Sequence, residues 1–190
     1  YELDAINEQY FSPYSWRILM SLNHKGLYKK VKRIQVKFSD KYLINNKGFN
    51  TVPVLEDNKN WVGESFQIAK YLDETYPNKP PLFGNKENMQ LTNLINLYMD
   101  PKILAILARI IVADVYKVIH PNDKIYFRAT REKMLNSTLE EVEKESKKFI
   151  PIFQKEINPF RKLLKNNDFF TGPKPMYCDY MLFGFFMWAR

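Results

Sequence analysis

The sequence predicts an alternating β/α domain followed by an all-helical bundle. Within residues 1–76, short runs of apolar and β-branched residues alternate with stretches of helical spacing. Residues 77–85, PNKPPLFGN, hold three prolines and one glycine, which is typical of a stiff linker. Residues 86–190 contain helical patterns and turn residues but no strand pattern. These three observations predict two domains joined by a proline-rich linker.

The first domain is expected to run β-α-β, then a connecting segment, then β-β-α. Ser12 and Pro13 form a typical helix start, because serine caps exposed backbone N–H groups and proline suits the first turn. Asp57 and Asn58 indicate a tight turn, and Pro77 ends the last helix. The expected strands are residues 1–6, 31–36, 51–55 and 61–62, and the expected helices are residues 13–25 and 66–76.

Four helical stretches are expected in the second domain, each ending near proline, asparagine or a polar cluster. Thr138 and Glu141 have the spacing of a capping box, in which each side chain satisfies a backbone N–H of the first turn. The expected helices are residues 87–119, 123–148, 150–165 and 177 onward.

Composition argues against several classes of protein. The 190 residues are 45% hydrophobic, enough for a substantial core, and no run is long and apolar enough for a membrane span. The first residues lack the order of a signal peptide, so we expect a cytoplasmic protein. A single cysteine, Cys178, excludes an internal disulfide, and two distant histidines, His24 and His120, argue against a metal site.

The formal charge of +8 raises the question of a nucleic-acid partner. Most basic residues are scattered, but residues 25–37, KGLYKKVKRIQVK, hold six of them and no acid. A phosphate-binding run of this kind would make the protein an interaction module. No nucleic-acid motif accompanies it, so solvated lysines beside a strand are the favoured interpretation. We expect neither a nucleic-acid nor a membrane partner.

Three local features of the first domain can each be structural or functional. Ser12 is by default a helix cap, but its hydroxyl also lies where the helix dipole favours an anion such as a thiolate. The proline of Val52-Pro53 suits an ordinary strand entry and, equally, a cis peptide bond that exposes Val52 to a peptide ligand. Glu64 and Ser65 are common helix-opening residues, yet they can also bind the ammonium and carboxylate of an α-amino acid.

The order and spacing of these motifs resemble the glutathione transferase superfamily. FSPYSWRILMSLNHKGL, TVPVL and GESFQIAKYLDETYPNKPPLF are similar to its N-terminal domain. SPY-x-WR, DKIYFRATREKML and DYMLFGFFMWAR are similar to serine-type bacterial lignin β-etherases and related fungal enzymes. The resemblance covers nearly the whole chain. It implies a thioredoxin-like N-terminal domain, an all-α C-terminal bundle, glutathione as co-substrate, no metal, and a cytoplasmic homodimer.

The resemblance also assigns roles at matching positions. It implies that Ser12 activates the glutathione thiol and that the cis-proline pair Val52 and Pro53 binds the cysteinyl part. It implies that Glu64 and Ser65 bind the γ-glutamyl end.

Other residues near Ser12 are less favoured candidates. Ser15, three residues along the same helix, ranks well below Ser12. Zeta-type relatives carry cysteine where this chain has Tyr14, and omega-type relatives carry cysteine at the Ser12 position, so both chemistries are disfavoured.

Two departures from the family pattern lie in the last helix. Met176 stands three residues before Asp179, where the family usually has Ser or Thr, so the expected N-cap is missing. Relatives also continue beyond the position of Arg190, which predicts a truncated or incompletely covered C-terminus.

A pocket for a second, apolar substrate is expected at the interface of the domains, facing Ser12. Phe11 and Tyr14 flank Ser12 and are the better candidates for its lining. Arg17 is expected to stabilise the structure through a buried ion pair or backbone carbonyls. Helical-domain residues are weaker candidates, because a helical stripe is more often core. They are Tyr98, Leu104, Arg109 and Tyr116.

Two functions follow from the resemblance. The leading hypothesis is an enzyme that activates the glutathione thiol for attack on a small apolar electrophile, by conjugation, ether cleavage or deglutathionylation. The alternative is a glutathione-dependent carrier of hydrophobic ligands with little turnover, because a fold does not fix a function.

Overall fold

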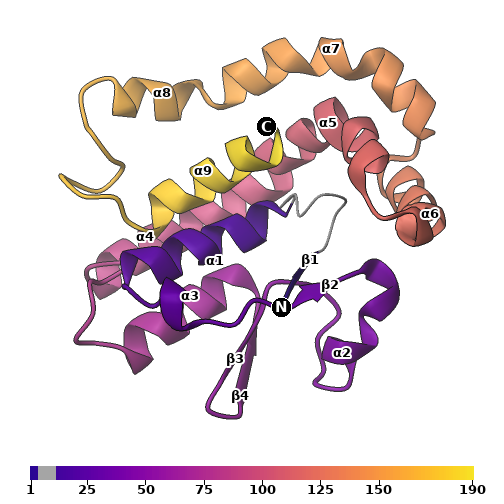
Figure 1. Ribbon diagram of the computed structural model, residues 1–190. Helices are drawn as coiled ribbons and strands as arrows, with labels where there is room; N and C mark the ends of the chain where they lie inside the picture. The colour runs from indigo at the N-terminus through magenta and orange to yellow at the C-terminus, as the bar shows by residue number, and fades with distance from the viewer. Residues whose placement is uncertain (4–11) are drawn as a thin grey trace.

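Four short strands form the β layer of the computed structural model in Figure 1, which describes residues 1–3 and 12–190. They are β1 (Glu2–Leu3), β2 (Gln35–Val36), β3 (Val54–Asp57) and β4 (Asn60–Gly63). β1 and β2 are parallel, whereas β3 and β4 form an antiparallel hairpin. Tyr1 and Val54 exchange backbone hydrogen bonds of 2.9 and 3.2 Å, which join the two pairs in the order β2-β1-β3-β4. The rest of the strand predicted for residues 1–6 lies outside the described residues.

The turn predicted at Asp57 and Asn58 is confirmed. Asn58 and Lys59 have φ of +48° and +70°, which is the geometry of a two-residue type I′ turn between β3 and β4.

The remaining elements of the first domain are helical. They are α1 (Pro13–His24), η2 (Tyr28–Lys30), η3 (Phe38–Asp40), α2 (Tyr42–Asn45) and α3 (Ser65–Thr75). The two predicted helices are present as α1 and α3, and the predicted connecting segment holds the short elements η3 and α2. Residues 76–85 then connect α3 to the helical domain without helix or strand.

The second half of the chain is helical, as predicted. Its elements are α4 (Lys86–Tyr98), the π-helical segment η4 (Met99–Leu104), α5 (Ala105–Val118), η5 (Pro121–Asp123), α6 (Lys124–Leu135), α7 (Leu139–Glu156), α8 (Asn158–Leu164) and α9 (Tyr177–Trp188). Among the described residues, no helix is both long and apolar enough to cross a membrane.

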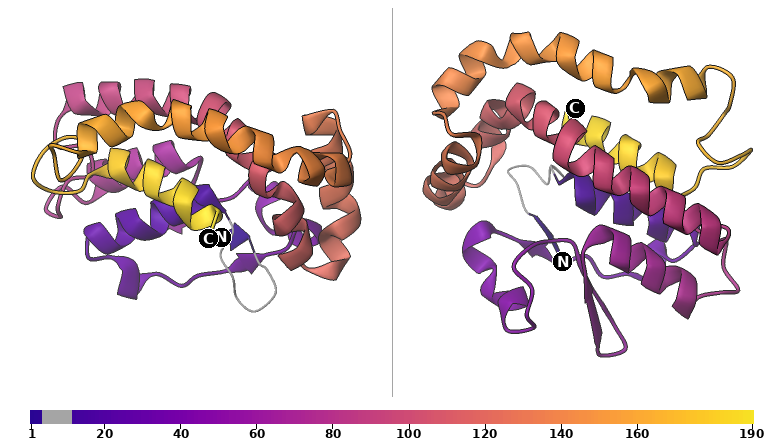
Figure 2. Two further views of the ribbon diagram at one scale, coloured as in Figure 1. Left: turned by 90° about the horizontal axis from the view of Figure 1, so that it is seen from above. Right: turned by 180° about the vertical axis from the view of Figure 1, so that it is seen from behind.

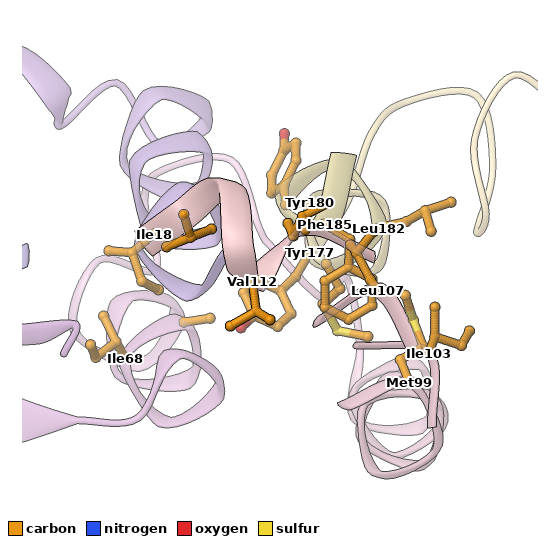
Figure 3. Packing of buried hydrophobic residues seen from close by; sticks show 14 of the residues in the cluster. Ile18, Ile68, Met99, Ile103, Leu107, Val112, Tyr177, Tyr180, Leu182 and Phe185 are labelled. Atoms are coloured by element: carbon orange, nitrogen blue, oxygen red, sulfur yellow. The ribbon is translucent and has the colours of Figure 1, made fainter. Parts of the chain in front are cut away.

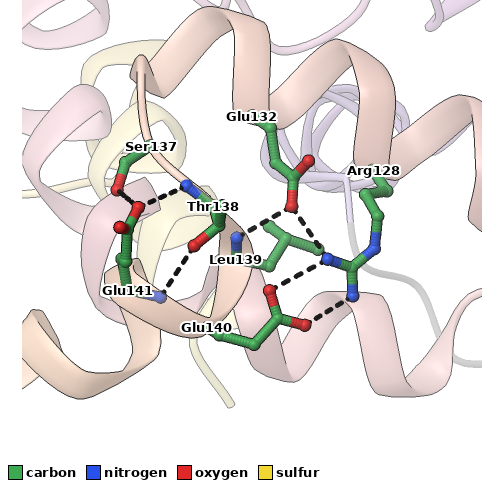
Figure 4. A network of polar contacts seen from close by, with 7 residues as sticks. All are labelled: Arg128, Glu132, Ser137, Thr138, Leu139, Glu140 and Glu141. Atoms are coloured by element: carbon green, nitrogen blue, oxygen red, sulfur yellow. Dashed lines mark hydrogen bonds and ion pairs between the residues drawn. The ribbon is translucent and has the colours of Figure 1, made fainter.

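The capping box at Thr138 is confirmed, and it divides the helix predicted over residues 123–148 into two helices. The Oγ1 of Thr138 accepts from the N–H of Glu141 at 3.2 Å, and Glu141 Oε2 accepts from the N–H of Thr138 at 2.9 Å (Figure 4). Asn136, at φ +50°, ends α6 just before this cap. The prediction of one helix over 123–148 was therefore wrong, because a left-handed residue followed by a capping box starts a new helix.

The prediction of a boundary near residue 150 was also wrong. Pro151 lies inside α7, which continues to Glu156. A proline removes one backbone hydrogen bond and kinks a helix. α7 nevertheless stays helical through Pro151, and as a whole it packs against α5.

One apolar core spans both halves of the chain. The buried cluster contains Ile18 of α1, Ile68 of α3, Leu107 of α5 and Phe185 of α9 (Figure 3). In Figures 1 and 2, α1 lies between the β layer and the helices α5 and α9. The division into domains at residues 77–85 stays a prediction, and the two halves share their apolar packing.

The start of α9 solves the problem of its missing N-cap. Asp179 Oδ2 accepts from the N–H of Met176 at 2.9 Å, and Oδ1 accepts from the N–H of Phe170 at 2.9 Å. Burial raises the pKa of Asp179, although these backbone hydrogen bonds oppose the rise. The aspartate thus serves the N–H group of Met176, a residue whose own side chain has no oxygen.

α9 approaches the first turn of α1 very closely at Gly184. A Cβ built on Gly184 would lie 2.5 Å from the carbonyl oxygen of Pro13 and 3.3 Å from Cγ of Arg17. A backbone oxygen cannot move aside as a side chain can, so the glycine is required for this contact.

We expect Gly184→Ala to lower the free energy of unfolding by about 1–3 kcal/mol, because the added methyl group must push α9 away from α1. Urea denaturation measures this change. Phe183→Ala is the control on the same helix, since Phe183 is 40% exposed. If Gly184→Ala destabilises no more than this control, the close contact is not needed.

Candidate functional site

Ser12 is the N-cap of α1. Its backbone is extended, with φ −93° and ψ 117°, and its Oγ accepts a hydrogen bond from the N–H of Ser15 at 3.2 Å. The residue is buried, with 6% exposed. Capping uses a lone pair of the oxygen, so the hydroxyl proton can still be donated to a second partner. The structural and the anion-binding interpretations of Ser12 are therefore compatible.

Tyr14 lies where three elements meet. Its ring packs against the guanidinium of Arg17 at 4.8 Å. Burial, together with the negative charges of Asp100 and Glu64, raises the pKa of Tyr14 to about 12 although Arg17 opposes the rise. The phenol is therefore protonated at neutral pH. Phe11, the other predicted neighbour of Ser12, lies outside the described residues.

Arg17 forms the buried ion pair that the sequence predicts. It is 0% exposed, and its guanidinium donates to Asp100 at 2.6 and 3.3 Å and to Asn96 at 3.0 Å. Burial is the largest influence on the pKa of Arg17 and lowers it, but the hydrogen bonds to Asp100 and the interactions with the Asp100 charge and the phenols of Tyr177 and Tyr14 together raise it above its usual value. The partner, more than eighty positions away in sequence, could not be predicted from local patterns.

The π-helical segment η4 supplies Asp100. Pro101 lies in this segment and has no N–H, so the regular hydrogen bond to the preceding turn cannot form at that residue. Wide π turns are frequent at functional positions of helices. Here the wide turn carries the carboxylate that neutralises Arg17.

The Val52-Pro53 peptide bond is cis, as expected from the sequence. It directly precedes β3, whose first residue Val54 pairs with Tyr1. The expected pairing of Val52 with the cysteinyl part of a peptide ligand stays a prediction.

Glu64 and Ser65 lie at the N-terminus of α3. Glu64 is exposed and has φ +63° and ψ 123°, a strained backbone that costs a residue other than glycine about 1–3 kcal/mol and is concentrated at functional sites. Thr51 Oγ1 donates to Glu64 Oε1 at 3.3 Å, so this motif touches the residue before Val52. Ser65 is buried, with 5% exposed.

The structure brings the three motifs of the first domain to one region. The charge of Glu64 acts on Tyr14, two residues after Ser12, and Thr51 contacts Glu64. α1 packs against α3 along the shared core. A thiol at Ser12 and an amino-acid end at Glu64 and Ser65 are therefore compatible with one ligand.

The predicted pocket residues of the helical domain contact other helices. Tyr98 donates to Glu156 at 2.9 Å, and Arg109 donates to the carbonyl of Leu135 at 3.1 Å. Tyr116 packs against the rings and cations of α6, and Leu104 packs against the core. That these four residues line a pocket for a second substrate stays a prediction.

The basic run is partly structural. Lys25 is buried and donates to Asp73 at 2.7 Å and to the carbonyl of Pro80 at 3.2 Å. Arg33 donates to Glu2 at 2.7 Å. Lys29, by contrast, is exposed. At least two of the six basic residues therefore form internal ion pairs, which favours the structural interpretation of the run.

Family models match both halves of this fold. Residues 11–75 match the glutathione S-transferase N-terminal domain, and residues 91–190 match the glutathione S-transferase C-terminal domain. The chain belongs to the glutathione S-transferase family. The thioredoxin-like and all-helical domain types predicted from the sequence are those of this family.

Individual relatives of this glutathione S-transferase chain include plant, mammalian and fungal proteins. It is 31% identical to Protein IN2-1 homolog B of Oryza sativa over 94 residues, which cover 48% of this chain and 38% of the rice protein. The match thus spans less than half of that relative. The structure of glutathione transferase GSTFuA3 from Phanerochaete chrysosporium is similar over 100% of this chain and 83% of its own, with 29% identity and a TM-score of 0.90. CsGST63524 of Ceriporiopsis subvermispora, in complex with glutathione, shares the fold at 24% identity, with a TM-score of 0.90 over 100% of this chain and 83% of its own.

We expect Asp100→Ala to lower the free energy of unfolding by about 3 kcal/mol, because it leaves the buried Arg17 without a carboxylate partner. Denaturant titration measures the loss. Asp114→Ala is the matched control: Asp114 and its partner Lys117 are 69% and 58% exposed, so the expected change is within about 0.5 kcal/mol. Equal effects of the two variants would contradict a central role of the Arg17 ion pair.

Proposed function

We propose that this protein is an enzyme in which Ser12 stabilises the thiolate of glutathione for attack on a small apolar electrophile. One observation carries the proposal: the Ser12 hydroxyl is buried at the N-terminus of a twelve-residue helix and uses only its oxygen for capping. The O–H is left to donate to an anion, and the helix dipole adds to its stabilisation.

Family membership and one neighbour support glutathione as the co-substrate. Glutathione transferases use this tripeptide, and CsGST63524 was crystallised in complex with it. In the proposed binding mode the thiol lies at Ser12, the cysteinyl backbone pairs with Val52 beside Pro53, and the γ-glutamyl end lies at Glu64 and Ser65. No metal takes part in this proposal.

The Ser12 hydroxyl and the dipole of α1 can supply the free energy that is needed to lower the thiol pKa. Lowering a thiol pKa from about 8.5 to about 6.5 takes roughly 2.7 kcal/mol of preferential stabilisation of the anion. One charge-assisted hydrogen bond supplies about 1.5–3 kcal/mol, and the helix dipole adds up to about 1 kcal/mol. A single hydroxyl at a helix N-terminus is therefore sufficient, and a catalytic triad is not needed.

The proposed reaction class is that of serine-type, etherase-like transferases. This chain has Ser12 at the position where cysteine-dependent relatives carry their nucleophilic cysteine. Conjugation and ether cleavage are therefore favoured over deglutathionylation. Tyr14, together with Phe11, is proposed to meet the electrophile beside the thiol. Such chemistry is typical of detoxification in the cytoplasm.

The second candidate is a carrier that binds glutathione and a hydrophobic ligand with little turnover. The close contacts of Tyr98 and Arg109 with neighbouring helices favour it, because they leave the electrophile pocket undefined. Turnover with a panel of aryl halides, aryl ethers and glutathione conjugates separates the two candidates.

We also propose a homodimer formed through α4. Leu91, Leu94 and Leu97 are spaced by three residues, so they share one side of the helix, and they are 59%, 64% and 64% exposed. Three exposed leucines in a row form an apolar surface that a second copy of the chain would cover.

The Ser12→Ala variant is expected to raise the pKa of the bound glutathione thiol and to reduce turnover, since the hydrogen-bond donor is lost. Thiolate absorbance of bound glutathione against pH measures the pKa. Ser12→Asp is the control for capping, because aspartate caps a helix as well as serine but places a negative charge beside the thiolate. It is expected to keep the stability of the protein and to raise the thiol pKa. If the titration curves of wild type and Ser12→Ala coincide, Ser12 acts only as a helix cap. The thiol pKa would then be measured in the same way for Ser15→Ala.

Leu94→Glu is expected to convert the dimer into a monomer, because each interface would have to bury two like charges. Analytical ultracentrifugation measures the mass. Leu163→Glu on α8 is the control, since Leu163 is 40% exposed and belongs to a different helix. A wild-type monomer at micromolar concentration would refute the proposed dimer.

A further inference from the structure

Three buried polar atoms near Ser12 make no hydrogen bond in the described part of the chain. They are Ser15 Oγ, Arg17 Nε and the hydroxyl oxygen of Tyr177. Buried polar atoms are almost always paired in native proteins, so each unpaired atom needs an explanation. A ligand whose binding aligns these groups into one chain of hydrogen bonds is one such explanation, and Tyr177 offers the most specific case.

The Tyr177 ring is fixed at the first position of α9. It is 0% exposed, and its ring centroid lies 5.3 Å from that of Phe83 and 5.9 Å from that of Phe66. Its backbone N–H donates to the carbonyl of Leu82 at 2.9 Å. Phe66 directly follows Ser65, so the Tyr177 side chain lies against the first turn of α3. Figure 3 shows Tyr177 among the core side chains between the helices.

Arg17, Ser65 and Asp100 act on the Tyr177 hydroxyl, and Asp100 does so through its negative charge. Burial raises the pKa of Tyr177 to about 12, while the Arg17 charge and the Ser65 hydroxyl oppose this rise. The phenol therefore keeps its proton at neutral pH and can donate one hydrogen bond. Arg17 can only donate, so its unpaired Nε matches an oxygen acceptor.

We propose that Tyr177 is a positioning residue for the γ-glutamyl end of glutathione. In the bound state Arg17 Nε donates to the Tyr177 oxygen, Tyr177 donates to Ser65 Oγ, and Ser65 donates its own proton to the ligand carboxylate. This inference rests on the proposed function and assigns to the helical domain a part in reading glutathione.

The direction of this chain of hydrogen bonds explains why a carboxylate completes it. A serine hydroxyl rotates freely, and an oxygen that accepts from Tyr177 turns its proton toward the opposite side. Every donor in the chain then points toward the ligand, starting from the positive charge of Arg17. Hydrogen bonds in such a chain strengthen one another. A ligand without the γ-glutamyl carboxylate gains nothing from it.

The test is a double-mutant cycle on glutathione affinity, measured by calorimetry. Tyr177→Phe keeps the ring and removes only the hydroxyl, and it is expected to weaken glutathione binding by about three- to tenfold. Ser65→Ala is expected to weaken it by about ten- to a hundredfold, and the double variant no further than Ser65→Ala alone. Tyr180→Phe is the matched control, because this tyrosine of the same helix bonds His24 at 2.7 Å.

Cysteinylglycine, which lacks the γ-glutamyl group, is the second probe. Its affinity is expected to be the same for wild type and Tyr177→Phe, whereas a merely structural role of Tyr177 would weaken both ligands alike. On the wild-type protein, the ¹³Cζ chemical shift of Tyr177 is expected to change with glutathione and not with cysteinylglycine. This measurement needs no variant to fold.

Three results would overturn the inference: unchanged glutathione affinity in Tyr177→Phe, additive effects of Tyr177→Phe and Ser65→Ala, or an equal change of the ¹³Cζ shift with both probes. A wild-type protein that fails to bind glutathione would instead refute the proposed function, and the inference with it. The two failures are distinguished by the wild-type titration alone.

Discussion

The buried charge of Arg17 is the constraint on which the arrangement of the helices depends. A guanidinium that is 0% exposed has to be neutralised and hydrogen-bonded, because an unpaired buried charge is far too costly. Asp100 neutralises it from η4, and the rings of Tyr14 and Phe185 cover it at 4.8 and 5.0 Å. These groups come from three separate elements, so α1, η4 and α9 can satisfy the charge only in one relative position.

The relative position of α1, η4 and α9 also determines the geometry of Ser12. Arg17 and Ser12 lie on the same helix, and Gly184 lets α9 approach the carbonyl of Pro13 directly after the cap. The first turn of α1 is therefore held both by an ion pair and by backbone contact. The two phenols around it, Tyr14 and Tyr177, have pKa values raised to about 12 and remain neutral. Neither phenol therefore adds a negative charge near the ion pair of Arg17.

Much of the fold was predictable because its determinants are local. The N-cap at Ser12, the type I′ turn at Asn58 and the capping box at Thr138 each depend on residues a few positions apart. The same reasoning failed at residues 136–151, where a left-handed asparagine ended one helix and another helix continued through Pro151. The partners of the site could not be predicted at all, since Asp100 and Tyr177 act on residues of the first domain across long sequence separations. In the sequence, only Pro101 inside an expected helix indicated that the helix is irregular at η4.

In the proposed function, the groups that bind glutathione and the groups that select the electrophile lie in different parts of the fold. The proposed glutathione groups lie beside a cis proline, where Val52 offers its backbone, and in the first turns of α1 and α3, where Ser12 and Ser65 offer hydroxyls. The TM-score of 0.90 to a structure of 24% identity shows that the fold itself is kept while the sequence changes. The helical domain is constrained differently, since Tyr98, Arg109 and Tyr116 contact neighbouring helices through their side chains. In the proposed function, selectivity for the electrophile would depend on which of these interhelical contacts leave space beside Ser12, and that is decided by packing between residues far apart in sequence.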